Sequence, residues 1–487
     1  MSKIVLLNLP IWDFSHPPLN LPTLAAPLRR RGYEVEQVDL NPRVLRRMGT
    51  INLNDAAHWM MDQNAIAVLQ EGQDPKGIVL QMKRELEQVK IGPGDMICIS
   101  TYRPQMIYSA LAAKWIRENF PDVLIIVGGI HATIVGADLL KQFDQFDVQV
   151  LGCGEGPITK LAEAWINKRP LPTTERGILV RINDRIDGVP TPWHESDMTT
   201  LPHPDFEGLN LEDYQYPVLP IQASRGCIGI CAFCGERNVW GKYRRKEAEQ
   251  VVNELALQQE SYKLSNFMFV DSQINSDQGR LEAICDGILD RGLDIRWGGF
   301  ARVDRLPKEL LEKMYVAGCR FLKFGVESGS QNMLNLMRKG INVEIAAVTL
   351  RNAHNAGIWT HTFWVLGFPG ETDETLQETF RFIECNAENI RSGAAGAFVL
   401  YPHSNVGVNP NRYGVINVRF NRTLREKFPE FQGLLMDWLE YDVVEGMSSA
   451  EAVASEQRVD ELFHKLGILT PEDGYQDKLF AYAYEVS

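Results

Sequence analysis

Three of the chain's eight cysteines lie within eight residues of one another. Cys227, Cys231 and Cys234 have the spacing C-x3-C-x2-C, and they directly follow a predicted strand. Thiolates bind zinc and iron–sulfur clusters, and clustered cysteines in a reducing compartment indicate metal binding or catalysis rather than disulfides. The other five cysteines share no second motif. The triad is therefore the first group of residues that could do chemistry.

The number of ligands distinguishes the possible metal centres. Structural zinc usually takes four ligands. The next cysteine in the sequence is Cys285, and His203, 24 residues before Cys227, is a possible fourth ligand. A 4Fe–4S cluster held by three cysteines leaves one iron open for another ligand. Three cysteines that bind no metal are the remaining alternative, and the spacing favours the cluster.

A series of strands and helices positions the triad. From residue 216 to residue 401, strands alternate with strongly periodic helices, and the triad follows the first strand. Six such units predict a partial (β/α)6 barrel, two units short of a full barrel, with its chemistry at the carboxyl ends of the strands. The predicted strands are 218–224, 266–271, 294–298, 320–327, 359–367 and 396–401.

The cysteine segment resembles the radical S-adenosylmethionine (radical SAM) superfamily, whose motif is C-x3-C-x-aromatic-C, with Phe233 as the aromatic residue. In that superfamily the open iron binds the amino and carboxylate groups of S-adenosylmethionine (SAM). One electron then cleaves SAM and yields a 5′-deoxyadenosyl radical, which abstracts hydrogen from unreactive carbon. The resemblance implies a 4Fe–4S cluster on Cys227, Cys231 and Cys234, SAM, and an external electron donor of the flavodoxin or ferredoxin type.

The same resemblance, which covers about residues 218–400, implies SAM contacts at the ends of later strands. The second strand end would contact the methionine amino group, and Arg302 could pair with the carboxylate because a guanidinium fork suits that shape. The fourth strand end would reach the ribose or carboxylate, and the fifth would line the adenine. A glycine-rich turn is the alternative for each segment, and Lys339 in a further matching element is alternatively a solvated charge. The candidate cofactor-binding residues are Phe233, Asp271, Ser272, Gln273, Arg302, Glu327, Ser328, Leu366 and Gly367.

Residues 1–170 also alternate between strands and helices. Near-continuous apolar strands separated by helices predict a Rossmann-like, doubly wound parallel sheet, which binds ligands at the carboxyl ends of its strands. A helical pattern over 53–90 is broken at Pro75 and Gly77. The predicted strands are 3–9, 34–40, 95–101, 123–127 and 148–151.

Glycine-rich segments follow the fourth and fifth of these strands, where the missing side chains would let a ligand approach the backbone. They resemble the cobalamin-binding domain often fused in front of radical SAM barrels. The resemblance implies that residues 1–170 hold cobalamin with its upper face toward the cluster. The D-x-H-x-x-G motif of histidine-ligated domains is absent, so the lower face would be empty, water-ligated or contacted by another side chain; a degenerate domain without cobalamin is the alternative. The candidate residues are Ser100, Thr101, Gly128, Gly129, His131, Gly154 and Glu155.

Two further regions complete the chain. Residues 171–215 are rich in proline and threonine and predict a hairpin near 177–187 followed by a linker. Residues 402–487 predict a small mixed region that caps the substrate site, with helical patterns near 421–440 and 449–466. The related subgroup often has P-G-T after the sixth barrel strand, where this chain has Pro402-His403-Ser404-Asn405. That departure suggests a distinct substrate pocket.

Composition and charge limit the possible partners. Hydrophobic residues make up 45% of the chain and charged residues 23%, as in ordinary globular proteins. The formal net charge of −13 argues against nucleic acid as a partner. No apolar run approaches the ~20 residues of a membrane helix, and no signal peptide is evident, so we expect a cytoplasmic protein that does not bind membranes.

These observations predict a cobalamin-dependent radical SAM enzyme that methylates an unactivated carbon of a small molecule or peptide. The alternative is radical SAM chemistry of another kind: cyclisation, rearrangement, or transfer of another part of SAM such as the 3-amino-3-carboxypropyl group. Methylthio transfer to tRNA is disfavoured because the N-terminal region has only Cys98 and Cys153 and no second triad. A protein that only carries metal or cobalamin would not explain the ordered barrel segments. The sequence assigns no acid or base residue.

Overall fold

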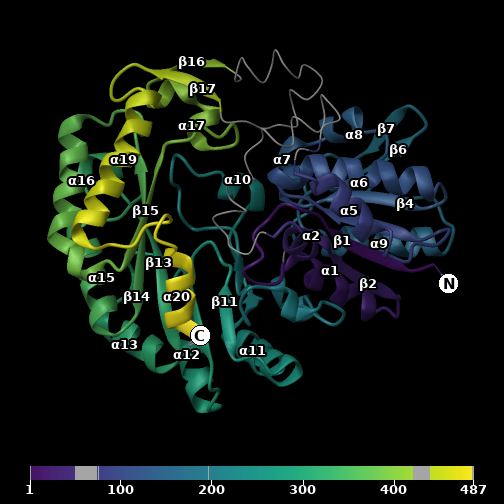
Figure 1. Cartoon of the computed structure of the whole chain (residues 1–487), viewed down its shortest axis with the longest axis horizontal. Coiled ribbons are helices and arrows are strands. Elements are labelled where there is room, and N and C mark those ends of the chain that lie inside the picture. The colour runs from purple at the N-terminus through teal and green to yellow at the C-terminus, as the bar shows by residue number, and fades with distance from the viewer. Residues whose placement is uncertain (1, 50–73, 75, 196, 420–438, 485–487) are drawn as a thin grey trace. The chain divides into compact units, whose positions relative to one another are not determined.

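The structure is a computed structural model that describes residues 2–49, 74, 76–195, 197–419 and 439–484. Its described residues divide into an N-terminal unit, Met1–Pro217, and a second unit that begins at Val218 and includes the C-terminal helices (Figure 1). Both units contain parallel sheets with covering helices, which confirms the α/β fold class. The boundary lies next to the one predicted at residue 216.

The N-terminal unit is built on one seven-stranded sheet of order β2-β1-β3-β4-β5-β6-β7. The first five strands are parallel, and β6 and β7 join them as an antiparallel hairpin. The segment predicted as a hairpin and linker therefore belongs in part to this sheet. The strands are β1 (Ile4–Asn8), β2 (Val35–Asp39), β3 (Met96–Ser100), β4 (Leu124–Gly128), β5 (Val148–Val150), β6 (Ile178–Ile182) and β7 (Arg185–Gly188).

Helices cover both faces of this sheet because successive strand residues point to opposite sides. Val5 and Leu7 pack into a core with α2, α5 and α6, whereas Ile4 and Leu6 pack into a second core with α1 and α9. Two buried faces account for the uninterrupted apolar strands in the sequence. Residues 53–73 and 75 of the predicted helical pattern lie outside the described residues. The helices are α1 (Asn20–Arg29), α2 (Leu40–Arg47), α5 (Ile78–Leu86), α6 (Met106–Asn119), α7 (Ile130–Val135), α8 (Asp138–Gln142) and α9 (Glu155–Ile166).

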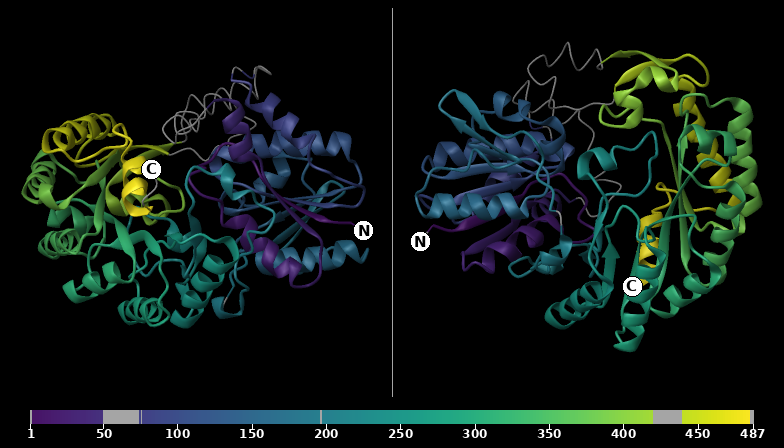
Figure 2. Two further views of the ribbon diagram at one scale, coloured as in Figure 1. Left: turned by 60° about the horizontal axis from the view of Figure 1, so that its bottom comes forward. Right: turned by 180° about the vertical axis from the view of Figure 1, so that it is seen from behind.

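The second unit contains the predicted partial barrel. Its six parallel strands lie in the order β15-β14-β13-β12-β11-β8, so each strand pairs with the next one along the chain. Figures 1 and 2 show a curved sheet with the connecting helices on its outer side. The strands are β8 (Leu219–Ile221), β11 (Asn266–Phe269), β12 (Arg296–Arg302), β13 (Cys319–Glu327), β14 (Trp359–Leu366) and β15 (Ser392–Ala397).

The outer helices begin where the sequence supplies capping side chains. Asp277, Asn342 and Thr372 each accept a backbone N–H bond at the start of a helix, which satisfies one of its free donors. The six barrel strands and the cysteine loop are therefore held by regular βα units. The helices are α11 (Ala248–Tyr262), α12 (Gln278–Asp290), α13 (Lys308–Val316), α14 (Gln331–Leu336), α15 (Val343–Asn355) and α16 (Asp373–Asn386).

The C-terminal region completes the barrel unit. Helix α19 (Ser449–Leu466) begins and ends where the sequence predicted and lies against β15, so closely that a Cβ on Gly393 would be 2.7 Å from the Phe463 ring. Helix α20 (Tyr475–Tyr484), which the sequence did not predict, lies on the inner side of the sheet, with Phe480 against Phe321 (Figure 1).

The C-terminal region also contains a small antiparallel pair, β16 (Val415–Arg419) and β17 (Glu440–Val443). The helix predicted near 421–440 falls almost wholly outside the described residues, and Glu440 begins a strand. Among the helices that the structure describes, none combines the length and the apolar character needed to cross a membrane.

Candidate active site

The cysteine loop leaves the carboxyl end of the first barrel strand through a tight turn. After β8, residues Ser224–Arg225 (β9) pair with Arg244–Arg245 (β10), and Gly226 then adopts a φ of +74°. A side chain there would be strained and would lie 3.1 Å from the Lys242 carbonyl oxygen, so the turn favours glycine. The loop ends at α10 (Glu236–Trp240). Its three cysteines thus lie at the end of the barrel that carries chemistry.

The structure places the sulfurs of two predicted cluster ligands, Cys227 and Cys231, beside Gly229, and Cys234 is near enough to interact with both electrostatically. A Cβ on Gly229 would lie 3.2 Å from the Cys227 sulfur and 3.7 Å from the Cys231 sulfur. The Gly229 N–H donates to the Cys227 sulfur over 3.2 Å, and the Glu236 N–H donates to the Cys234 sulfur over 3.4 Å. Such N–H donors stabilise thiolates, the form that binds iron. The residues present therefore fit a thiolate-held cluster.

Burial raises the pKa of two of these thiols. It raises that of Cys234 to about 11, and it raises that of Cys227 although the Gly229 N–H and Arg302 act in the opposite direction. The metal-free thiols are thus protonated at neutral pH, and iron binding displaces their protons. Within the described part of the chain, no three His, Cys, Asp or Glu side chains are placed to hold a single metal ion.

The residues predicted after the second strand support the cysteine loop. Asp271 is 1% exposed, and its carboxylate accepts bonds from the Ala223 N–H, over 3.0 Å, and from the Ser224 hydroxyl. These bonds fix the start of the loop. Exposed Ser272 donates to Glu236 at the end of the loop, and the buried Gln273 amide donates to Ser276 over 2.8 Å. Their contact with SAM stays a prediction.

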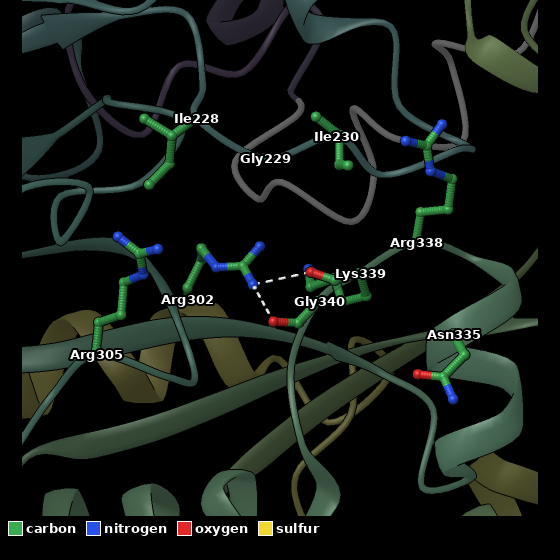
Figure 3. Close-up of a pocket in the computed structure, with 9 residues that line it drawn as sticks. All are labelled: Ile228, Gly229, Ile230, Arg302, Arg305, Asn335, Arg338, Lys339 and Gly340. Carbon is green, nitrogen blue, oxygen red and sulfur yellow. Dashed lines mark hydrogen bonds between the residues drawn. The ribbon is translucent and has the colours of Figure 1, made fainter.

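Arg302 lies under the cysteine loop, and most of its guanidinium is already in use. Its Nε pairs with Asp304 over 2.8 Å, and its Nη2 donates to the Lys339 carbonyl over 2.8 Å and to that of Gly340 over 3.3 Å (Figure 3). Its Nη1 makes no hydrogen bond with the described residues and is 3.6 Å from the Cβ position of Gly229. Nη1 is therefore the guanidinium nitrogen that could donate to the carboxylate of a ligand bound beside the cysteine loop.

Glu327 and Lys339 form a buried ion pair that the sequence analysis did not find. Their side chains are 9% and 8% exposed, and the Nζ–Oε1 distance is 2.7 Å. Burial lowers the pKa of Lys339, but Glu327 and the Cys231 thiol raise it, and the net shift is upward. A Cβ on Gly325 would lie 2.3 Å from the Glu327 carboxylate. The alternative that Lys339 is a solvated charge is therefore wrong.

Phe233, the aromatic residue of the motif, packs beside this ion pair. Its ring centroid is 6.0 Å from the Lys339 Nζ, within reach of a cation–π interaction. It also packs against the core that contains Met333, Met337 and Phe368. Phe233 thus connects the cysteine loop to the fourth and fifth barrel units, and its contact with a cofactor stays a prediction.

The last predicted SAM segments are packed against outer helices. Ser328 is 1% exposed and shares a 3.1 Å hydrogen bond with Thr379 in α16. Leu366 is fully buried, and Gly367 has a φ of +70° and approaches α19 so closely that a Cβ would lie 2.2 Å from that of Ala452. The Gly367 N–H donates to the buried carboxylate of Glu371. Packing accounts for this glycine, and contact with the adenine stays a prediction.

Glu371 should make the stability of the barrel unit depend on pH. Burial raises its pKa from 4.5 to about 7, although the Gly367 N–H partly opposes the shift. Between these values the folded protein binds a proton that the unfolded chain releases, so stability falls as pH rises, by ~3 kcal/mol over the whole window. Glu371→Gln should lack this fall. Urea unfolding at pH 5 and pH 8 measures the free energy of unfolding of both proteins. If the difference between wild type and variant is the same at both pH values, Glu371 does not cause the pH dependence.

His403, from the segment where P-G-T is replaced, lies beside the cysteine loop. Its ring occupies the space next to Gly235, where a Cβ would lie 2.0 Å from the ring carbon Cδ2. Asn238 donates to the His403 carbonyl over 2.5 Å, and the Val406 N–H donates to the Ala232 carbonyl over 3.1 Å. Burial lowers the pKa of His403. The segment suggested by sequence as a pocket determinant therefore contacts the residue after Cys234.

In the N-terminal unit, the predicted residues after β3 and β4 meet at the carboxyl edge of the sheet. The Thr101 N–H donates to the Gly128 carbonyl over 2.9 Å, and the His131 N–H donates to the Thr101 carbonyl over 3.3 Å. Gly129 has a φ of +100°, and its Cβ would lie 3.2 Å from the Ser100 hydroxyl. His131 is 2% exposed. These residues form one polar edge, as the order of the strands requires.

The glycines after β5 are explained by packing within the unit. A Cβ on Gly154 would lie 2.8 Å from Leu24, and one on Gly156 would lie 2.9 Å from the Trp193 indole. Glu155, 5% exposed, begins α9. The structure therefore supports tight packing for this loop, and a ligand contact at Gly154 or Glu155 stays a prediction.

A group of polar and aromatic residues that was not predicted from the sequence lies at the ends of β1 and β3. The order 2-1-3-4 makes this the topological switch point, where doubly wound sheets bind ligands. Half-buried Trp12 stacks on Tyr102 with ring centroids 4.4 Å apart. Below them the Gln105 amide donates to Asn8 over 3.1 Å, and Asn8 donates to Asp39, whose pKa burial raises to about 6. Single polar or aromatic residues at strand ends have no spacing pattern that could have shown this group.

A partial parallel barrel with a C-x3-C-x2-C loop after its first strand is typical of radical SAM domains. Residues 221–383 match the Radical SAM superfamily, so this part of the chain is a radical SAM domain. The resemblance stated from the cysteine motif is confirmed. An uncharacterised methyltransferase of Pyrococcus horikoshii is 26% identical over 59% of this chain. The match spans 63% of that relative, less than two thirds of its length.

Two solved structures have the same fold over most of the chain. The cobalamin-dependent SAM radical enzyme OxsB, with aqua-cobalamin and SAM bound, has a TM-score of 0.70 at 16% identity and covers 100% of this chain and 71% of its own. The radical SAM methyltransferase TsrM from Kitasatospora setae, with cobalamin and a [4Fe–4S] cluster bound, has a TM-score of 0.64 at 18% identity and covers 87% of this chain and 81% of its own. At 16% and 18% sequence identity, these similarities show a shared fold and no more.

Proposed function

We propose that the protein is a cobalamin-dependent radical SAM enzyme that methylates an unactivated carbon of a small molecule or peptide. The observation that carries the proposal is the cysteine loop: two of its sulfurs lie against Gly229, and Arg302 and Lys339 lie beside it. The named function of the Pyrococcus horikoshii relative and of TsrM supports methyl transfer.

Each residue of the loop has a role in this proposal. Cys227, Cys231 and Cys234 hold a 4Fe–4S cluster, and the cluster together with SAM supplies the 5′-deoxyadenosyl radical. Arg302 uses Nη1 for the SAM carboxylate, while its other nitrogens stay on Asp304 and the 339–340 carbonyls. The charge of Lys339 beside Cys231 stabilises the anionic thiolates, since opposite charges in a buried site interact strongly.

The N-terminal unit holds cobalamin in this proposal, and cobalamin carries the methyl group. The carboxyl edge formed by Ser100, Thr101, Gly128, Gly129 and His131 is the predicted site. The Trp12–Tyr102 stack at the switch point supplies aromatic surface next to this edge, which would suit a flat macrocycle. The bound cofactors of OxsB and TsrM support this part of the proposal.

Following the methyl group of SAM tests the proposal without a known substrate. The protein, reconstituted anaerobically with iron, sulfide and cobalamin, is incubated with methyl-labelled SAM and dithionite. We expect 5′-deoxyadenosine to form and the label to appear in the cobalamin fraction. Formation of 5′-deoxyadenosine with no label on cobalamin would contradict methyl transfer and favour another radical reaction. Absence of both products would overturn the enzyme assignment.

A further inference from the structure

A cationic pocket of about 330 Å³ lies beside the cysteine loop in the barrel unit (Figure 3). One wall is the loop between the first two cluster cysteines, and the other wall follows β12 and α14. Four of its side chains are basic, in a chain whose net charge is −13. The pocket is lined by Ile228, Gly229, Ile230, Arg302, Arg305, Asn335, Arg338, Lys339 and Gly340.

Two of the four basic side chains make at most one weak contact with the residues that the structure describes. Arg302 and Lys339 are buried and paired with Asp304 and Glu327. Arg305 is exposed, and its one ion-pair contact is at 4.0 Å to Asp304, which already pairs with Arg302. The exposed guanidinium of Arg338 makes no hydrogen bond or ion pair with the described residues. These two arginines are thus available to an anionic partner.

The backbone holds Arg338 next to the cysteine loop. The Ala232 N–H donates to the Met337 carbonyl over 2.8 Å, and the Lys339 N–H donates to the Leu334 carbonyl over 2.9 Å. Arg338 itself has a φ of +53°, which non-glycine residues seldom adopt. The loop around Arg338 is therefore fixed to the loop that holds the cluster ligands.

The pocket also has an apolar contact surface close to the cysteine sulfurs. Ile230, at the tip of the cysteine loop, is 44% exposed. Gly229 lines the pocket, and its Cβ position is within 4 Å of the Cys227 and Cys231 sulfurs. A protein seated on this surface would be separated from the cluster ligands by little more than the Gly229 backbone. Apolar groups beside arginines are common at protein interfaces.

We propose that the rim of this pocket, formed by Arg305 and Arg338, is the docking surface for an acidic protein that carries one electron at a time, while Arg302 inside the pocket stays available to SAM. This inference rests on the proposed function, which requires a reduced cluster. In the electron transfer, the reduced carrier loses one electron and is oxidised, and the cluster gains that electron and is reduced. No bond forms or breaks. A chain of charge −13 repels an acidic carrier at long range, so productive docking needs a local cationic surface.

Reversing the two rim charges tests the docking surface. Arg305→Glu/Arg338→Glu is compared with Arg291→Glu/Arg351→Glu, which makes the same change of net charge at two exposed arginines that do not line the pocket. Cluster reduction is followed by stopped-flow absorbance with an acidic reduced flavodoxin, and separately with photoreduced 5-deazariboflavin, a small uncharged reductant. At low salt the rim variant should be reduced by flavodoxin at least ~10-fold more slowly than wild type, and the difference should shrink at high salt.

The second reductant separates the possible outcomes. We expect reduction by deazariboflavin, and the SAM cleavage that follows it, to be the same in the rim variant, the control variant and wild type. An equal loss with both reductants would show that the arginines serve SAM or the cluster, and would overturn the proposal. Unchanged flavodoxin rates, or an equal loss in the control variant, would also overturn it. Failure of wild type to cleave SAM with either reductant would instead reject the proposed function.

Discussion

Replacing Cys231 by alanine is expected to abolish cluster binding and SAM cleavage together. The other two thiols would then leave two irons without protein ligands, and a cluster with fewer thiolates is poorly held. The Gly229 and Glu236 N–H groups that support Cys227 and Cys234 cannot replace a missing sulfur. Cys227→Ala and Cys234→Ala should have the same effect. Iron and sulfide content, visible absorbance and 5′-deoxyadenosine formation after anaerobic reconstitution measure it.

Cys385→Ala is the matched control for these variants. Cys385 is an exposed thiol in the same unit, on α16, and belongs to no cluster motif. This variant should keep the iron content and activity of wild type. Full cluster content in any one of the three triad variants would contradict the assignment of the ligands. Loss of the cluster in Cys385→Ala would show that any cysteine substitution in this unit disturbs the protein enough to prevent cluster binding.

The barrel could be predicted from its sequence because its strands are apolar and separated by periodic, capped helices. The sixth strand shows where this reasoning ends. It was predicted at 396–401, and β15 begins at Ser392. The sequence of β15, SGAAGA, has no β-branched or aromatic residue, so local propensity gives no strand there. Pairing with β14 and the close approach of α19 at Gly393 form this strand, and both are contacts with distant residues.

The cysteine triad could be recognised in the sequence because its spacing and its place after the first barrel strand are typical of the radical SAM motif, and its role as the set of cluster ligands stays a prediction. The other site residues needed the fold. Asp271 looked like a cofactor contact, and its carboxylate is bonded to Ala223 and Ser224, 47 or more residues earlier in the chain. The glycines after β5 were predicted to form a cofactor loop; Leu24 and Trp193 occupy the space that side chains at Gly154 and Gly156 would need, and a cofactor contact stays a prediction. A glycine pattern shows that something approaches the backbone, but only the structure shows whether it is part of the same protein.

Replacing Lys339 by methionine is expected to destabilise the barrel unit by ~3–5 kcal/mol, because it leaves the Glu327 carboxylate buried without its partner. Glu327→Gln should lower the free energy of unfolding by a smaller amount. In that variant Lys339 keeps its cation–π contact with the Phe233 ring, whereas Glu327 in the first variant loses the only ion pair that it makes with the described residues. The free energy of unfolding, measured by urea denaturation of the full chain at pH 8, tests the order.

The double variant Lys339→Met/Glu327→Gln should lose less stability than Lys339→Met alone, since removing both charges removes the unpaired buried carboxylate. Additive losses in the double variant would show that the two charges act independently. In that case the two side chains would lie close together without stabilising each other's charge, and only the cluster thiolates would account for a charged Lys339.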